Sequence, residues 1–153
     1  MGKLYIVRHA HAGSRGAGRA DHVRHLSDRG DRQAKALRDD LVGAGITRLV
    51  SSPFTRCVET LVPLGLTLGI TVETDRRLAE AQGSAGALAL ADELQHETAV
   101  LCSHGDVIPD LLEALVHQGV RFDDDLRWPK ASTWVLSRNG NGFSKGRYLP
   151  PPA

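Results

Sequence analysis

Short apolar runs alternate with longer segments in which apolar residues recur at helical spacing. Lys3–Val7 and Thr98–Cys102 are nearly continuous apolar runs that stop abruptly at polar residues, which is typical of strands buried in a parallel sheet. Ile46–Val50 and Ile70–Glu73 predict two more strands. Strands that alternate with helices in this way favour a mainly parallel sheet with helices on both of its faces.

Cap and turn residues mark the helices between these strands. Ser27 is the predicted N-cap of the first helix. Ser52 and Pro53 are predicted to open the second helix as its cap and first residue, because the missing N–H of proline costs nothing there. Pro63 is expected to end or kink that helix. A third helix, of roughly ten residues, is predicted after Gly86.

The last third of the chain predicts one more helix and two closing strands. Residues 107–115 have helical spacing, and Pro109 is tolerable there only in the first turn. Ser132–Leu136 and Phe143–Leu149 predict two strands around a turn rich in Asn and Gly. The region 13–25 has no periodicity and is predicted to be a loop. The whole pattern predicts an α/β fold with three layers.

Length and composition exclude several classes of protein. The 153 residues predict one domain over residues 1–149 and a short proline-rich tail over residues 150–153. A net charge of +1 gives no overall field that would attract nucleic acid polymers or an anionic membrane surface. We find no membrane-spanning run and no signal-peptide pattern. Two cysteines are too few for a disulfide framework and lack zinc-site spacing, so a cytoplasmic protein is expected.

Polar residues follow three of the predicted strands. Arg8 and His9 follow the first, Ser52 follows the second with Arg56 one turn later, and His104 follows the fourth. Because ligands bind outside the carboxyl ends of parallel strands, we expect these side chains to converge. Arginine suits a phosphate group, and a neutral imidazole can attack phosphorus near pH 7.

Each of these residues also has an ordinary structural interpretation. Arg56 could be a solvated helix residue or an i,i+3 partner of Glu59. His104 could make a local hydrogen bond at a strand end, and Glu80 could be a plain surface carboxylate. The functional interpretation therefore depends on their appearance together, in order, at the edge of one sheet.

Five segments resemble the histidine phosphatase superfamily, which includes the cofactor-dependent phosphoglycerate mutases. They are VRHA at Val7–Ala10, LSDRGDRQA at Leu26–Ala34, SSPFTRCVET at Ser51–Thr60, LAE at Leu78–Glu80 and SHG at Ser103–Gly105. The resemblance covers about the first 115 residues in collinear order. It implies the phosphoglycerate mutase-like fold, a sandwich with a mainly parallel central sheet.

The resemblance assigns a role to each matching residue. His9 matches the histidine that takes up the phosphoryl group as a covalent phosphohistidine. Arg8, Arg56 and His104 match the pocket that binds phosphate and stabilises the charge of the transition state. Glu80 matches the carboxylate that protonates the leaving oxygen and then activates water. The resemblance implies neither a cofactor nor a metal ion.

Among the subgroups, the chain looks most like short members, namely SixA-type phosphohistidine phosphatases and the phosphatase domains that follow Nudix domains. The segment RHAHAGSR at Arg8–Arg15 is especially similar to the Nudix-linked group. Arg15 lies where longer relatives carry a phosphate-contacting Asn, which makes it a candidate phosphate ligand. Ala10 departs from the glycine of the best-known motif, a change that the family tolerates.

Spacing separates the hydrolases of the superfamily from its mutases. The mutases carry a much longer insertion between the positions that match Glu80 and His104, and this insertion covers their site. Here the interval has room for barely one helix and one strand. An open site lets water complete the reaction, so we expect a hydrolase. Its substrate would be a phosphohistidine protein, a nucleotide or a sugar phosphate, and its oligomeric state is left open.

Two alternatives from other classes remain at this point. The pairs His9-x-His11 and His22-x-x-His25 look like metal ligands, as in a metal-dependent hydrolase, although no acidic or cysteine partner has a matching spacing. A degenerate phosphatase fold could also bind phosphate without turnover, although all core positions of the motif are filled. Trp128 and Trp134 could belong to the core or line the mouth of the site, and the core is preferred.

Overall fold

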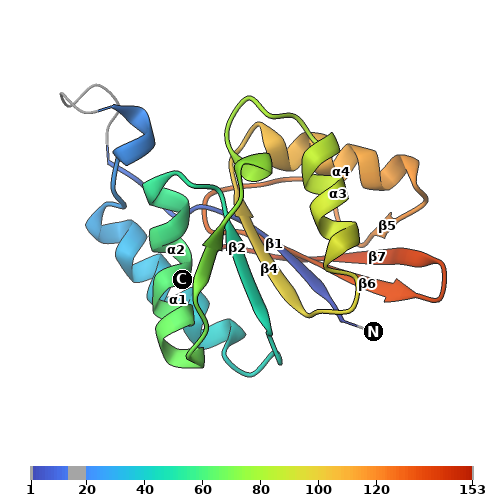
Figure 1. Cartoon of the computed structure of the whole chain (residues 1–153), viewed down its shortest axis with the longest axis horizontal. Helices are drawn as coiled ribbons and strands as arrows, with labels where there is room; N and C mark the ends of the chain where they lie inside the picture. Colours follow the sequence, from blue (N-terminus) through green and yellow to red (C-terminus); the bar gives the residue numbers. More distant parts are fainter. Residues whose placement is uncertain (1, 14–19, 153) are drawn as a thin grey trace.

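The computed structural model describes residues 2–13 and 20–152, and its strands form one sheet between helices (Figure 1). In chain order, the elements are β1 Leu4–Arg8, η1 Asp21–Val23, α1 Asp28–Leu41, β2 Arg48–Ser51, α2 Thr55–Leu68, β3 Val72–Thr74, η2 Arg76–Leu78, α3 Ala85–Glu93, β4 Ala99–Ser103, α4 Val107–His117, β5 Arg121–Phe122, β6 Thr133–Asn139 and β7 Gly142–Leu149. Within the described residues, none of the helices is both long and apolar enough to cross a membrane.

The seven strands of the described residues lie in the order β3-β2-β4-β1-β6-β7-β5. The pairs β3–β2, β2–β4, β4–β1 and β7–β5 are parallel, whereas β6 is antiparallel to both of its neighbours. The predicted α/β fold with a mainly parallel sheet is therefore confirmed. Because β1, β2 and β4 are adjacent and parallel, their carboxyl ends meet at one edge of the sheet.

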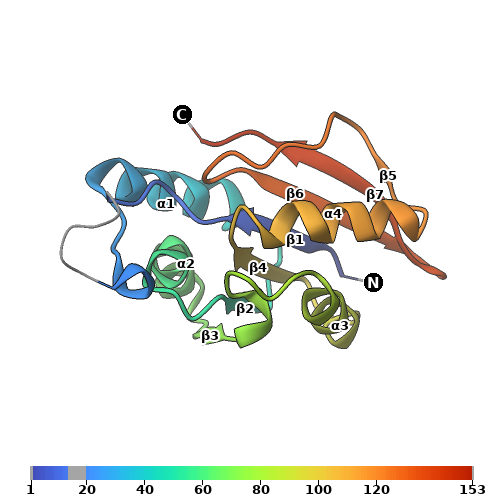
Figure 2. The same ribbon diagram turned by 90° about the horizontal axis from the view of Figure 1, so that it is seen from above.

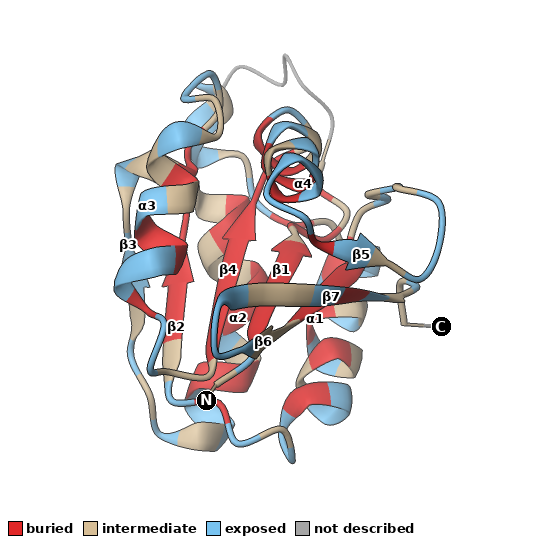
Figure 3. Ribbon diagram, turned by 90° about the vertical axis from the view of Figure 1, so that its right-hand side faces the viewer, coloured by how far each residue is buried: buried red, intermediate tan, exposed pale blue. Residues whose placement is uncertain are grey.

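Two apolar cores hold the helices against the sheet. Helices α1 and α2 cover one face, and α3 and α4 cover the other (Figures 1 and 2). Figure 3 shows buried residues along β1, β2 and β4, with exposed residues on the outer sides of the helices. A strand between two cores has to be apolar on both faces, which explains the unbroken apolar runs of β1 and β4.

The start of α1 is fixed by a cap and by a close backbone contact. The Ser27 hydroxyl accepts a hydrogen bond from the Gly30 N–H, so the predicted N-cap is confirmed. Gly30 lies so close to the loop after β1 that a Cβ atom on it would be 1.9 Å from the His11 carbonyl oxygen. Only glycine fits at this crossing of two backbones.

Helix α2 begins later than predicted and does not end at Pro63. Ser52 is not its cap: the N-cap is Phe54, and the Ser52 hydroxyl instead lies 2.8 Å from a ring nitrogen of His104. Pro63 lies inside the helix, which continues to Leu68. The buried residues Leu61 and Leu64 on either side of Pro63 offset the loss of one helical hydrogen bond.

The C-terminal part of the sheet is a hairpin with one added edge strand. The two closing strands predicted around the Asn- and Gly-rich turn are confirmed as β6 and β7. The two-residue β5 was not predicted, because a pair of residues carries no periodic signal. Trp134 is 1% exposed in the core, as preferred, and Trp128 packs against the same core from its partly buried position. Pro109 lies in the first turn of α4, as required.

Replacing Gly30 with alanine should destabilise the fold. The added methyl group would meet the His11 backbone, which cannot move as a flexible side chain can, so we expect a loss of about 1–3 kcal/mol in the free energy of unfolding. Urea denaturation measures it. Gly43→Ala is the matched control, because nothing lies within 4 Å of its Cβ position. Equal free energies of unfolding for the two variants would contradict the close contact between Gly30 and the His11 backbone.

Candidate active site

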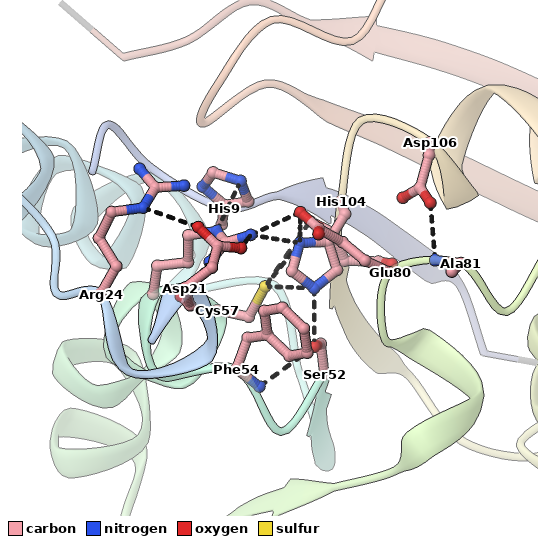
Figure 4. Close-up of polar contacts among 12 residues, drawn as sticks. His9, Asp21, Arg24, Ser52, Phe54, Cys57, Glu80, Ala81, His104 and Asp106 are labelled. Carbon is pink, nitrogen blue, oxygen red and sulfur yellow. Dashed lines mark hydrogen bonds and ion pairs between the residues drawn. The ribbon is translucent and has the colours of Figure 1, made fainter. Parts of the chain in front are cut away.

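Three strands deliver polar residues to one edge of the sheet (Figure 4). His9 directly follows β1, Ser52 follows β2 and His104 follows β4. Arg56 lies in the first turn of α2, and Glu80 lies in the loop after η2. His9, Arg56 and Glu80 line a cleft with a volume of about 560 Å³. The structure thus brings together the residues that the sequence placed at separate strand ends.

His9 is held as a neutral ring with one nitrogen facing the cleft. Its Nδ1–H donates to the Ala10 carbonyl at 2.8 Å, so the lone pair is on Nε2, where it accepts a hydrogen bond from Arg56 Nε at 3.4 Å. The ring is 4% exposed. The pKa of His9 is lowered from 6.5 to about 3, mainly by burial; the backbone hydrogen bond to Ala10 opposes this, and Arg56, His104 and Arg8 add to it.

Backbone contacts fix the segment that carries His9. The Ala10 N–H donates to Thr60 Oγ1 at 2.9 Å, and the Thr60 hydroxyl donates to the Arg56 carbonyl at 2.7 Å. On the other side, the Ala131 N–H donates to the His9 carbonyl at 3.2 Å. Helix α2 and the loop before β6 therefore both position the ring.

Arg56 is a completely buried cation with acidic and aromatic partners. Its Nη2 lies 2.5 Å from Glu80 Oε1 and 3.2 Å from Asp21 Oδ2, and its Nη1 donates to the Asp21 carbonyl at 2.9 Å. Its guanidinium carbon lies 5.0 Å from the centre of the Phe54 ring. The surface interpretation of Arg56 is wrong, and Glu59 instead contacts the loop before α1.

Arg8 presents a buried donor to the same cleft. Its Nη1 donates to the Trp128 carbonyl at 3.0 Å, but its Nε is buried and has no hydrogen-bond partner in the part of the chain that the structure describes. A Cβ on Gly105 would lie 2.8 Å from the Arg8 guanidinium carbon, so a larger residue there would displace the Arg8 side chain. An unpaired buried N–H is costly, and a bound anion would satisfy it.

His104 completes the ring of polar groups. Ser52 Oγ lies 2.8 Å from its Nε2, and the Phe54 ring packs edge-on against it with centroids 4.7 Å apart. Its Nδ1 lies 3.4 Å from Glu80 Oε1. If the Ser52 hydroxyl donates to Nε2, the ring proton lies on Nδ1, which is 3.5 Å from Arg56 Nη2. The centroids of the His104 and His9 rings are 5.6 Å apart.

The loop that carries Glu80 is fixed by a backbone bend. Ala81 has a left-handed φ of 67°, and its N–H donates to Asp106 Oδ2 at 2.8 Å (Figure 4). The bend turns the Glu80 carboxylate toward Arg56 and His104, while 31% of the side chain stays exposed. A carboxylate placed between the phosphate ligands and solvent can exchange protons with both sides.

Sequence reasoning missed Asp21 and Lys130, and it placed Ser52 at the sheet edge but with the wrong role. Asp21 pairs with Arg56, and Ser52 positions His104 rather than capping a helix. Lys130 lines the cleft from the loop before β6. None of them stands in a periodic pattern, so only their long-range contacts identify them. Arg15, the candidate extra phosphate ligand, lies outside the described residues.

The histidines of the alternative metal site do not gather around one point. His9 Nδ1 is bonded to a backbone carbonyl, His11 Nδ1 lies 2.6 Å from a serine hydroxyl, and His25 Nδ1 lies 3.0 Å from a glutamate carboxylate. His22 packs against a phenylalanine ring. Over residues 2–13 and 20–152, no three His, Cys, Asp or Glu side chains are grouped in a way that could hold a metal ion. These contacts favour the phosphate interpretation of the site.

A family model decides between these interpretations. The model of the histidine phosphatase superfamily, branch 1, matches residues 4–86, which is more than half of the chain. The chain belongs to this superfamily. The matched region contains Arg8, His9, Arg56 and Glu80. The predicted family is confirmed.

One curated relative is similar to nearly the whole chain. The chain is 32% identical over 155 residues to the 8-oxo-(d)GTP phosphatase of Mycolicibacterium smegmatis, and the match covers 97% of this chain and 48% of that protein. The chain therefore spans about half the length of this curated relative.

Solved structures support the fold. The protein histidine phosphatase SixA, complexed with tungstate, has a TM-score of 0.78 at 20% identity, and the match covers 99% of this chain and 96% of that one. The mycobacterial glucosyl-3-phosphoglycerate phosphatase with inorganic phosphate has a TM-score of 0.71 at 22% identity, with 100% and 98% covered.

The stability of this chain should depend on pH through His9. Because the pKa of His9 is lowered from 6.5 to about 3 by folding, the unfolded state binds the extra proton between these values. Stability contributed by the neutral ring is therefore complete above pH 6.5 and lost as the pH falls, by up to about 1.4 kcal/mol per pH unit. Urea unfolding of wild type and His9→Gln across this range isolates the effect. Identical pH slopes in the two proteins would contradict the depressed pKa.

Proposed function

We propose that the chain is a phosphohydrolase that removes a phosphoryl group through a covalent phosphohistidine on His9 Nε2. The observation that supports this most directly is the His9 ring, which is neutral and held by its Nδ1–H with Nε2 facing the cleft. Arg8, Arg56 and His104 surround that nitrogen with donors, as a phosphate group requires. His9 is thus the nucleophile, and these three residues are the phosphate ligands.

The first step transfers the phosphoryl group to the enzyme. The His9 Nε2 lone pair forms the P–N bond while the bond from phosphorus to the leaving oxygen breaks. The guanidinium groups of Arg8 and Arg56 and the Nδ1–H of His104 stabilise the charge on the phosphoryl oxygens. Glu80, in its protonated form, gives its proton to the leaving oxygen.

The second step returns the enzyme to its starting state. Water enters through the cleft, Glu80 takes one of its protons, and the oxygen attacks phosphorus as the P–N bond breaks. Inorganic phosphate leaves, and His9 is again a neutral ring. The exposed part of Glu80 is where water would be activated.

The substrate we propose is a small phosphomonoester or a phosphohistidine, as in SixA-type enzymes. A second candidate is a nucleotide, as for the Nudix-linked phosphatase domains. It is favoured by the likeness to the 8-oxo-(d)GTP phosphatase, which extends over 97% of this chain. A phosphate-binding module without turnover is the remaining alternative, and covalent labelling separates it from an enzyme.

His9→Ala should abolish both turnover and covalent labelling by a phosphate donor, because no other group at the sheet edge can replace the nucleophile. Label on wild type should be labile to acid and stable to base. His117→Ala, at the exposed end of α4, is the matched control and should keep both activities. Residual turnover of His9→Ala within tenfold of wild type would remove His9 from the mechanism, and an unlabelled, inactive wild type would favour the binding module.

Glu80→Gln should slow the hydrolysis of an alkyl phosphate much more than that of p-nitrophenyl phosphate. A general acid matters most for a poor leaving group, and the nitrophenolate departs without being protonated. The measurement compares kcat/KM of wild type and variant for the two esters. Equal losses on both would mean that Glu80 only holds Arg56, to which it is bonded. No loss on either would make it a bystander.

A further inference from the structure

A second group of cations lies beside the proposed phosphate ligands and is not used by the mechanism. This outer cluster consists of Arg24, Arg29 and Lys130 around His11. Arg24, His11 and Lys130 line the same cleft as His9. The positive charges of Lys130, Arg29 and Arg24 add to the effect of burial in lowering the pKa of His11, so this ring does not add another charge.

Lys130 is placed at the cleft by contacts that tie its loop to β1. The next residue, Ala131, has a left-handed φ of 65° and donates its N–H to the carbonyls of Arg8 and His9. Two residues before Lys130, the Trp128 carbonyl accepts from the Arg8 side chain. Both contacts are with the residues that carry the proposed chemistry, so the loop that bears Lys130 is fixed relative to His9.

The charge of Lys130 is not balanced by the residues around it. Its ammonium group makes no hydrogen bond or ion pair with any residue in the described ranges. Burial lowers its pKa, as do the charges of Arg8 and Arg24. A cation that is partly buried among other cations is stabilised by binding an anion.

Arg24 is oriented toward the cleft but only partly neutralised. Its Nε lies 3.2 Å from Asp21 Oδ1, and its Nη1 donates to the Gly13 carbonyl at 2.5 Å. Asp21 is shared with Arg56, so one carboxylate serves two guanidinium groups. Figure 4 shows Arg24 and Asp21 on the same side of the site, next to His9.

We propose that the outer cluster binds a second phosphate group, so that the preferred substrate ends in a diphosphate whose terminal phosphoryl group is transferred to His9. This inference rests on the proposed function. A cleft of about 560 Å³ is within the range of small-molecule sites and exceeds what one phosphate group fills. The inner ligands Arg8, Arg56 and His104 take the terminal phosphate, and Lys130 and Arg24 take the adjoining one.

With a diphosphate substrate, the leaving oxygen is stabilised by nearby positive charge and does not need a proton. His9 Nε2 forms the P–N bond, and the bond between the terminal phosphorus and the bridging oxygen breaks. The bridging oxygen departs as part of a phosphate monoester, whose new negative charge lies next to Lys130 and Arg24. Because a phosphate is a good leaving group, Lys130 would supply by charge what Glu80 supplies by proton transfer for an alkyl phosphate.

Binding of two simple probes tests the inference without turnover. Titration calorimetry would compare inorganic orthophosphate with methylenediphosphonate, a diphosphate analogue that cannot be hydrolysed. We expect the wild type to bind methylenediphosphonate at least about tenfold more tightly, which is the scale of one charge-assisted hydrogen bond. Phosphonoacetate, in which a carboxylate replaces the second phosphonate, should bind more weakly than methylenediphosphonate.

Variants of Lys130 assign the preference to the outer cluster. Lys130→Met keeps the aliphatic stem and removes the charge, so the preference for methylenediphosphonate should fall by about tenfold or more. Lys130→Arg keeps the positive charge and should retain most of the preference for methylenediphosphonate. Lys145→Met, on the exposed side of β7, is the matched control and should keep all of it.

Three results would overturn the inference: equal binding of both probes by the wild type, an undiminished preference in Lys130→Met, or phosphonoacetate bound as tightly as methylenediphosphonate. The failure of the proposed function has a different signature. In that case the wild type would show no His9-dependent hydrolysis of any ester, while the binding preference for methylenediphosphonate would still be measurable and would still depend on Lys130.

Discussion

The burial of the Arg56 guanidinium is the constraint on which the rest of the site depends. A fully buried charge without partners costs several kcal/mol, so the chain has to bring acceptors to it. Asp21 comes from η1, Glu80 from the loop after η2 and the Phe54 ring from the start of α2. Three segments that are far apart in the sequence therefore close around one side chain, and the cleft is what remains between them.

Burial among the same cations explains why the proposed nucleophile is uncharged. His9 is buried beside Arg8 and Arg56, and this environment lowers the pKa of its ring to about 3. A phosphate group needs cations nearby, whereas the attack on phosphorus needs a lone pair on nitrogen. One arrangement meets both needs, because burial keeps the proton off the ring and the charges that attract the anion add to that effect.

Sequence alone predicted those parts of the molecule that depend on local pattern. The abrupt ends of the apolar runs placed His9 and His104 at the sheet edge, and parallel pairing of β1, β2 and β4 brings them together. Ser52 was misassigned because Ser-Pro is a strong local cap signal, whereas its partner His104 lies far along the chain. Asp21 and Lys130 were missed for the same reason, since their positions follow from tertiary contacts and not from any periodicity.

The residues proposed for the chemistry and those proposed to select the substrate lie in different parts of the fold. Arg8, His9 and His104 lie at strand ends, where the register of the sheet fixes them. Lys130 and Arg24 lie in connecting segments, which tolerate change without disturbing the sheet. A loop tied to β1 by the Ala131 N–H can carry a different side chain at position 130 and leave His9 in place. Proteins that share this fold can therefore act on different phosphate compounds, because the sheet edge and the loops change independently.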